Sequence, residues 1–134
     1  MTDTDFIAYA EGVCFSRPWT AGDIAACTES MDGVCAVDEG VGYAFGRISF
    51  DEAELYRIAV LPDKRGRGAG SALLARFIQK CTERGAVKIF LEVRSENVPA
   101  VKLYEKHGFR HISTRRGYYG DDDALIYEYP AAED

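Results

Sequence analysis

Residues 64–71, KRGRGAGS, combine two features that suit a phosphate group, side-chain cations and glycines. Glycines let the main chain approach an anion closely, and Lys64, Arg65 and Arg67 add positive charge. The segment lies between a strand-like run and a helical pattern, so the free amides and positive dipole of a helix start would face the same ligand. The stretch therefore indicates a phosphate-bearing ligand. The glycine pattern by itself leaves one alternative open, a helix start with an exposed basic turn.

Spacing excludes two familiar phosphate-binding motifs. A P-loop needs GxxxxGK followed by Ser or Thr, and the sequence contains no such run. A dinucleotide-binding fingerprint needs GxGxxG, whereas Gly66, Gly68 and Gly70 are spaced GxGxG. Neither a P-loop nor a Rossmann site is supported.

Glu92 lies inside an otherwise apolar strand-like run, KIFLEV, at residues 88–93. In a strand, Leu91 and Val93 face one side of the sheet and Glu92 faces the other. A carboxylate in such a run is costly to bury unless it is paired or used. It can serve as a general base where a reaction needs a proton acceptor. An ordinary solvated glutamate at a sheet edge or cleft is the alternative.

Hydrophobic periodicity predicts the elements that must position these residues. The second helix begins at Thr20 or Asp23, and the last helix is capped by Ser95 or Asn97. In the first helix, the apolar side is predicted to carry Phe6, Tyr9 or Ala10, Val13 and Cys14. The predicted elements are, in order, helix 5–15, helix 20–27, hairpin 34–50, strand 54–60, helix 69–84, strand 88–93, helix 97–106, and an antiparallel pair of strands, 109–119 and 123–129.

This order predicts an α/β protein built on one mixed sheet, in a single domain over residues 1–134. The chain is 47% hydrophobic and 28% charged, which is typical of a globular protein. No apolar run approaches the roughly 20 residues that cross a bilayer, and no secretory signal pattern is present. We therefore predict a cytoplasmic location and no membrane partner. A net charge of −6 argues against direct nucleic-acid binding and leaves room for a cationic partner.

Residue spacing predicts no metal site. The cysteines form no CxxC pair and no Cys/His ligand pattern, and neither His107 nor His111 has a carboxylate or cysteine at ligand spacing. Both histidines are predicted to lie at the surface. The cysteines are predicted to be reduced, buried thiols: Cys14, Cys27, Cys35 and Cys81.

Residues 65–70, RGRGAG, resemble the (Q/R)xxGxG/A motif of the GNAT superfamily of acyl-CoA-dependent N-acyltransferases. The segments LEVRSENVPAVKLYEKHGF (91–109), RRGYYGDDDALIYEY (115–129) and RPWT (17–20) are similar to its RimI-type branch, the ribosomal-protein-alanine N-acetyltransferases. The resemblance covers nearly the whole chain and is most specific at 91–109. It implies a GNAT fold, a single mixed β-sheet flanked by helices. Family members open with a strand, but only MTDT precedes the first helix here, so that strand is missing or vestigial.

The resemblance also implies acetyl-CoA as cosubstrate and assigns roles to residues. The main chain of the strand end Ile58-Ala59-Val60 holds the thioester carbonyl, and Asn97 contacts the cofactor. Glu92 accepts the proton of the acceptor amine. The amides of the glycine-rich loop hold the pyrophosphate, through Arg65, Gly66, Arg67, Gly68, Ala69, Gly70 and Ser71.

Tyr104 belongs to LYEKHGF, which matches the LYxxxGF segment of the RimI-type branch. By spacing alone, most tyrosines at such a helical position are core or boundary residues. The resemblance implies instead that Tyr104 protonates the departing CoA thiolate.

The implied reaction is direct attack of an amine on acetyl-CoA in a ternary complex. The implied acceptor is a protein or peptide N-terminus, with a basic ribosomal protein as a candidate. A small amine, a protein lysine, or a non-catalytic acyl-CoA-binding sensor are the rival hypotheses, and the oligomeric state is not predicted. Trp19, Tyr118 and Tyr119 either frame a peptide groove or pack, and Asp121–Asp123 is either a solvated turn or a patch that attracts a basic peptide.

Overall fold

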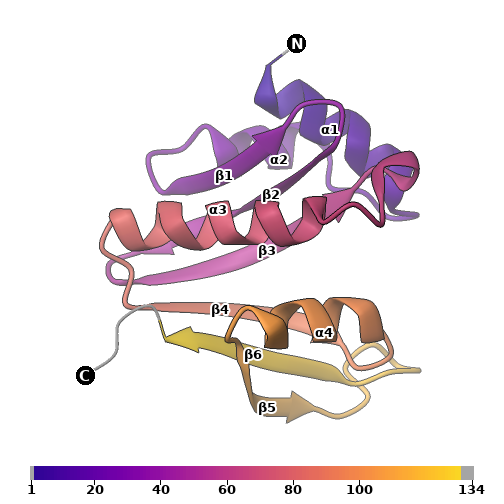
Figure 1. Cartoon of the computed structure of the whole chain (residues 1–134), viewed down its shortest axis with the longest axis vertical. Coiled ribbons are helices and arrows are strands. Elements are labelled where there is room, and N and C mark those ends of the chain that lie inside the picture. Colours follow the sequence, from indigo (N-terminus) through magenta and orange to yellow (C-terminus); the bar gives the residue numbers. More distant parts are fainter. Residues whose placement is uncertain (1, 131–134) are drawn as a thin grey trace.

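A computed structural model describes residues 2–130 of the chain. The helices and strands follow the predicted order, and α1 is the first element within residues 2–130. Their bounds, with the labels of Figure 1, are α1 Asp3–Cys14, α2 Ala21–Thr28, β1 Gly33–Asp38, β2 Gly42–Ser49, β3 Glu52–Val60, the 3-10 turn η1 Pro62–Lys64, α3 Ala69–Glu83, β4 Lys88–Arg94, α4 Val98–Lys106, β5 Arg110–Arg115 and β6 Ala124–Pro130.

The strands form one mixed sheet in the order β1-β2-β3-β4-β6-β5. Within residues 2–130, only β3 and β4 pair in parallel, and their pairing is short, from Glu52 beside Lys88 to Leu55 beside Leu91. Beyond those residues the two strands diverge toward the side where α3 and α4 begin (Figure 1). The centre of the sheet is therefore open at one end.

Two apolar layers cover the two faces of the sheet. The larger layer packs α3 and α4 against the face that carries Ile89, Leu91 and Val93 of β4, which confirms the predicted alternation of that strand. The smaller layer packs α1 and α2 against Tyr43 and Phe45 of β2. Figure 1 shows α3 and α4 in front of the sheet and α2, fainter, behind it.

The predicted apolar side of α1 was wrong in part. Phe6, Ala10 and also Ile7 are buried, whereas Tyr9 and Val13 are 58% and 46% exposed. The buried side instead includes Glu11, which is fully buried because it has polar partners described below. None of the helices in residues 2–130 is long and apolar enough to cross a membrane.

All four cysteines are free thiols. Cys27 and Cys81 are buried, as predicted, while Cys14 and Cys35 are only half-buried. Burial raises the pKa of the Cys81 thiol to about 12.

Candidate active site

A cavity of about 650 Å³ lies where β3 and β4 diverge. It brings together the end of β3, the glycine-rich loop and the start of α4, which the sequence predicted to form one site. Of the predicted site residues, Gly66, Arg67, Ala69 and Glu92 do not line it. The lining residues are Cys14, Phe15, Ile58, Ala59, Val60, Arg65, Gly68, Gly70, Ser71, Asn97, Pro99, Ala100, Leu103 and Tyr104.

One wall of the cavity is the main chain of β3. The register of β2 and β3 shifts between Phe45 and Gly46, which pair with Arg57 and Leu55, so Tyr56 is an extra residue in β3. A bulge of this kind bends and twists its strand. Because β4 pairs only as far as Leu55, the main-chain groups of residues 58–60 that point toward β4 have no strand partner there. Apart from the Val60 carbonyl, which already accepts a hydrogen bond from Arg65, they are available to a ligand.

The start of α3 forms a second wall. The N-cap residue Gly68 has φ +80° and makes no side-chain capping bond, whereas Thr2, Thr20 and Asn97 cap the other α-helices with their side chains. The first amides of α3 are therefore left without an internal acceptor, as an anion site requires. At Gly70, an added Cβ would lie 3.8 Å from the nearest side-chain atoms of its neighbours. That distance is ordinary van der Waals contact, whereas at Gly68 an added Cβ would meet nothing within 4 Å, so open space lies beside the helix start.

Arg65 is partly committed to the protein, because its Nε donates to the Val60 carbonyl at 2.9 Å. This bond ties the glycine-rich loop to the end of β3, so two walls of the cavity are held together. Arg67 is exposed, and Lys64 ends the 3-10 turn η1. The loop thus keeps the positive charge that the sequence indicated beside the uncapped helix start.

Tyr104 lies on the α4 wall. Its side chain is buried and packs against Phe109, with 5.8 Å between ring centroids. Burial raises the pKa of the Tyr104 hydroxyl to about 12. Within residues 2–130 the Tyr104 hydroxyl has no hydrogen-bond partner. Every fully buried side-chain nitrogen or oxygen in the same residues has one, so this hydroxyl is not fully buried. Because Tyr104 lines the cavity, its hydroxyl is open to the cavity.

Glu92 is half-buried on β4 and lies on the face of the sheet opposite to Leu91 and Val93. Its Oε1 accepts a hydrogen bond of 2.6 Å from the Tyr119 hydroxyl, which sequence reasoning did not assign to it. Partial burial, this bond and the charge of Glu92 raise the pKa of Tyr119 to about 12. Partial burial and the same charge raise the pKa of Glu54 on β3. The Glu92 carboxylate is therefore held by a hydrogen bond and is not freely solvated.

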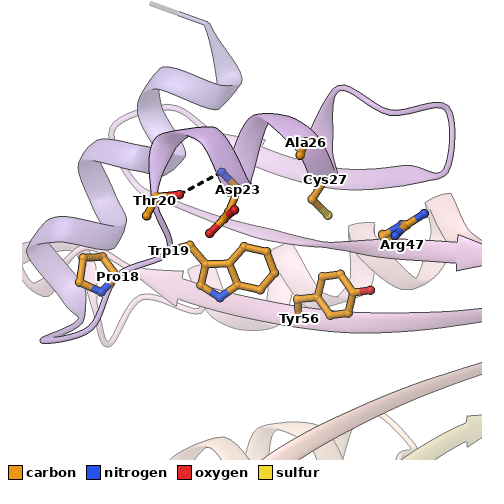
Figure 2. Close-up of a pocket in the computed structure, with 8 residues that line it drawn as sticks. All are labelled: Pro18, Trp19, Thr20, Asp23, Ala26, Cys27, Arg47 and Tyr56. Carbon is orange, nitrogen blue, oxygen red and sulfur yellow. Dashed lines mark hydrogen bonds between the residues drawn. The ribbon is translucent and has the colours of Figure 1, made fainter.

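A second cavity of about 580 Å³ lies between α2 and strands β2 and β3 (Figure 2). The ring of Trp19 stacks on Tyr56 at 5.5 Å and meets Phe45 edge-on at 5.1 Å. Tyr118 and Tyr119 pair with each other, at 5.2 Å. The three aromatic residues that the sequence grouped thus do not all pack together: Tyr118 and Tyr119 pair with each other, and Trp19 packs on Tyr56 and Phe45 while it lines a cavity. Figure 2 shows Asp23 directed toward the same space, while its amide donates to Thr20 at 3.0 Å.

The segment between α1 and α2 is fixed by a buried carboxylate that sequence reasoning missed. Glu11 accepts hydrogen bonds from the Tyr43 hydroxyl, from the Arg57 guanidinium at 3.1 Å, and from the Trp19 amide at 2.8 Å. Arg57 also donates to the Arg17 carbonyl at 3.1 Å. The network therefore sets the position of the segment that carries residues of both cavities.

Asp122 is not part of a solvated turn. It is buried, and its carboxylate accepts bonds from the Ser95 hydroxyl and from the amides of Glu96 and Asp123. The Ser95 bond is the main reason that the pKa of Asp122 lies below its usual value. This aspartate joins the β5–β6 connection to the start of α4. Only Asp121 is exposed, with a weak ion pair to Arg94 at 3.4 Å.

Of the two predicted surface histidines, His111 is exposed, as predicted, but His107 is half-buried. His107 Nε2 lies 2.7 Å from the Ser71 hydroxyl, so the prediction for His107 was wrong.

Within residues 2–130, the sheet opens between its parallel strands, with an uncapped helix start and a tyrosine without a hydrogen-bond partner at the opening, which fits the acyl-CoA-dependent N-acyltransferases that the sequence resembles. Residues 6–109 match the Acetyltransferase (GNAT) family, and the chain belongs to that family. It is 41% identical over 99 residues to the [Ribosomal protein bS18]-alanine N-acetyltransferase of Salmonella typhimurium, a match that covers 71% of this chain and 67% of that enzyme. The corresponding Escherichia coli K12 enzyme is 41% identical over 92 residues, which cover 66% of this chain and 62% of that enzyme.

Solved structures agree with this assignment. The crystal structure of the Escherichia coli ribosomal-protein-S18-alanine N-acetyltransferase has a TM-score of 0.88 and 31% identity, and it covers 100% of this chain and 91% of that one. A GNAT acetyltransferase from Elizabethkingia anophelis, solved with acetyl-CoA bound, shares the fold at a TM-score of 0.72 and 18% identity, with 97% of this chain and 91% of that one covered.

Proposed function

We propose that this acetyltransferase moves acetyl from acetyl-CoA to the N-terminal α-amine of a protein, with the alanine N-terminus of a ribosomal protein as the first substrate to test. The observation that carries the proposal is the cavity between β3 and β4, which has anion-binding amides at one side and the Tyr104 hydroxyl at another. Identity of 41% to enzymes that act on bS18 alanine supports the choice of acceptor. The predicted cytoplasmic location is consistent with such a substrate.

The residues present fit acetyl-CoA. The amides of Gly68, Gly70 and Ser71 would hold its pyrophosphate, since they lie at an uncapped helix start with room above them. The main chain of residues 58–60 would hold the thioester carbonyl and, during attack, the negative charge that develops on its oxygen. Asn97 lines the same cavity at the start of α4. When bound, acetyl-CoA supplies the activated acetyl group.

Glu92 would accept the proton of the attacking amine, directly or through water. An ammonium group has no lone pair for attack, so a proton acceptor is required. An α-amine has a pKa of about 7.7 to 8.0, and roughly a quarter of it is already neutral near pH 7.4, against about a thousandth of a lysine amine. A carboxylate base is therefore better suited to deprotonating an α-amine than a lysine amine. The Tyr119 hydroxyl would hold Glu92 in place through its 2.6 Å bond.

Tyr104 would donate a proton to the departing CoA sulfur. Its pKa of about 12 keeps the hydroxyl protonated at neutral pH. Against a solvated thiol with a pKa of about 8.5, full transfer would be uphill by roughly 5 kcal/mol. The thiolate, however, leaves within the same poorly solvated cavity, where burial raises its proton affinity as well. The two shifts partly cancel, which keeps the transfer feasible.

The experiment that tests this assignment compares two neighbouring carboxylates. In the Glu92→Gln variant we expect kcat with an N-terminal alanine peptide to fall by about a hundredfold or more, because the proton acceptor is lost. CoA binding, measured by calorimetry, should remain, since Glu92 does not line the cofactor cavity. Glu54→Gln is the matched control and should keep kcat within a few-fold. Equal losses in both variants, or no loss in Glu92→Gln, would contradict the role given to Glu92.

A further inference from the structure

A hydrogen bond joins the start of α3 to the end of α4. Ser71 is in the first turn of α3 and lines the cofactor cavity, and its hydroxyl lies 2.7 Å from Nε2 of His107, the C-cap residue of α4. His107 itself does not line the cavity. His107 therefore contacts the proposed phosphate site only through the Ser71 side chain.

The ring is also a titratable group near neutral pH. Burial and then the neighbouring charge of Lys106 hold the pKa of His107 below its usual value, which keeps the ring neutral in the free protein at pH 7. The loop before α3 adds further positive charge on Lys64, Arg65 and Arg67. On α4, the carboxylate of Glu105 is bonded to the Tyr127 hydroxyl at 2.7 Å. From β6, the ring of Tyr129 packs beside Gly108.

We propose that His107 is a further positioning residue for the phosphates of the cofactor, acting through the Ser71 hydroxyl, and that it takes up a proton when the cofactor binds. The proposal rests on the acetyl-CoA site described above. It adds a residue that the motif of that site does not contain.

The chemistry follows from the two protonation states of the ring. In a neutral ring whose Nε2 lacks a proton, that nitrogen accepts the serine hydrogen, and Ser71 turns only lone pairs toward the cavity. In the protonated ring, and in the neutral tautomer that carries its hydrogen on Nε2, this nitrogen donates to the serine oxygen, which frees the serine hydrogen to donate to a phosphate oxygen. Protonation also places a positive charge behind the amides of α3. An anion in the cavity therefore favours the protonated ring.

Linkage gives the direction of the pH dependence. A bound phosphate stabilises the charged ring, so the pKa of His107 is higher in the complex than in the free protein. Above both pKa values the ring contributes nothing to the dependence. As the pH falls from the bound value to the free value, affinity rises, by about tenfold if the two differ by one unit. Below both values the gain is complete.

Proton NMR of the imidazole signals tests this directly, because the chain has only two histidines. The exposed His111, which bonds Thr114 at 2.8 Å on β5, is an internal control. With saturating CoA, we expect the pKa of His107 to rise by about one unit and that of His111 to stay unchanged. An unchanged His107 titration with CoA bound would overturn the proposal. A protein that binds no CoA at all would overturn the cofactor site itself.

Calorimetry supplies the second arm. CoA carries a phosphate monoester that itself titrates near pH 6, so each variant is compared with the wild type at the same pH values. His107→Gln keeps a bond to Ser71 but cannot be charged. The ratio of wild-type to His107→Gln affinity for CoA should therefore be larger at pH 5.5 than at pH 8, by up to about tenfold. His111→Gln should follow the wild type. The same wild-type to His107→Gln ratio at both pH values would rule out proton uptake by His107.

Discussion

We expect the Arg57→Met variant to unfold at a markedly lower denaturant concentration than the wild type. Arg57 is the only cationic partner among the groups that bond to Glu11 in residues 2–130, and the carboxylate of Glu11 is fully buried. Two nitrogens of Arg57 reach that carboxylate, at 3.1 and 3.2 Å. Methionine fills similar space but leaves a buried negative charge with only the neutral donors Tyr43 and the Trp19 amide.

The size of the effect follows from burial. Removing one partner of a buried ion pair costs about 3 to 5 kcal/mol. The Arg57 side chain is 25% exposed, so water can partly replace it, and we expect the low end, about 3 kcal/mol. For a chain of this length that loss corresponds to a fall in Tm of about 10 °C.

Urea unfolding of the variant and of two controls measures this. Asp32→Asn removes the exposed partner of Arg47, whose ion pair spans 3.3 Å with side chains 49% and 60% exposed, and should cost below about 1 kcal/mol. Adding Glu11→Gln to Arg57→Met should recover part of the loss, because the stranded charge is gone. The reasoning would be refuted if Arg57→Met lowered the free energy of unfolding by as little as Asp32→Asn does. It would also be refuted if the double variant lost as much unfolding free energy as its two single changes together.

Three further outcomes are expected. Tyr104→Phe should lower kcat by about a hundredfold or more and leave the acetyl-CoA Kd within a few-fold, and a variant with normal kcat would remove Tyr104 from the mechanism. Because the pKa of Tyr104 is about 12, the kcat of the wild type should show no loss from ionisation of this tyrosine up to pH 10. Gly70→Asp should abolish CoA binding by charge and bulk while the fold survives, since an added Cβ meets nothing closer than 3.8 Å, and calorimetry with Gly70→Ala as control checks this. The lowered pKa of Asp122 means that its charge stabilises the fold above the usual aspartate pKa, and this contribution is lost as the pH falls through the lowered value. Asp122→Asn should therefore reduce Tm more at pH 7 than at an acidic pH below the usual aspartate pKa; an equal reduction at both pH values would contradict it.

The element order and the glycine-rich loop could be predicted because their signals are local. Spacing of apolar residues gave the helices and strands. Residue type placed two caps at Thr20 or Asp23 and at Ser95 or Asn97, and the structure has them at Thr20 and Asn97. The grouping of Gly68, Gly70 and Ser71 with Ile58–Val60 also follows from chain order, since the loop joins β3 directly to α3.

The contacts that were missed join residues far apart in the chain. Glu11 on the buried side of α1 makes sense only with Arg57, 46 residues later on β3. Asp122 can be buried because Ser95, 27 residues earlier, donates a hydrogen bond to its carboxylate. His107 meets Ser71 because the fold places the end of α4 beside the start of α3, which no spacing rule contains. A charged residue amid apolar helix positions, as at Glu11, was the one available signal.

Mass spectrometry of acetyl transfer to matched peptides tests the central proposal most directly. One peptide begins with a free alanine and contains a lysine, and the second is the same peptide with its N-terminus blocked. Incubated with this protein and acetyl-CoA, the first should gain one acetyl group on its α-amine, and the second should gain none. Acetylation of the lysine in the blocked peptide, or CoA binding without transfer to either peptide, would contradict the proposed function.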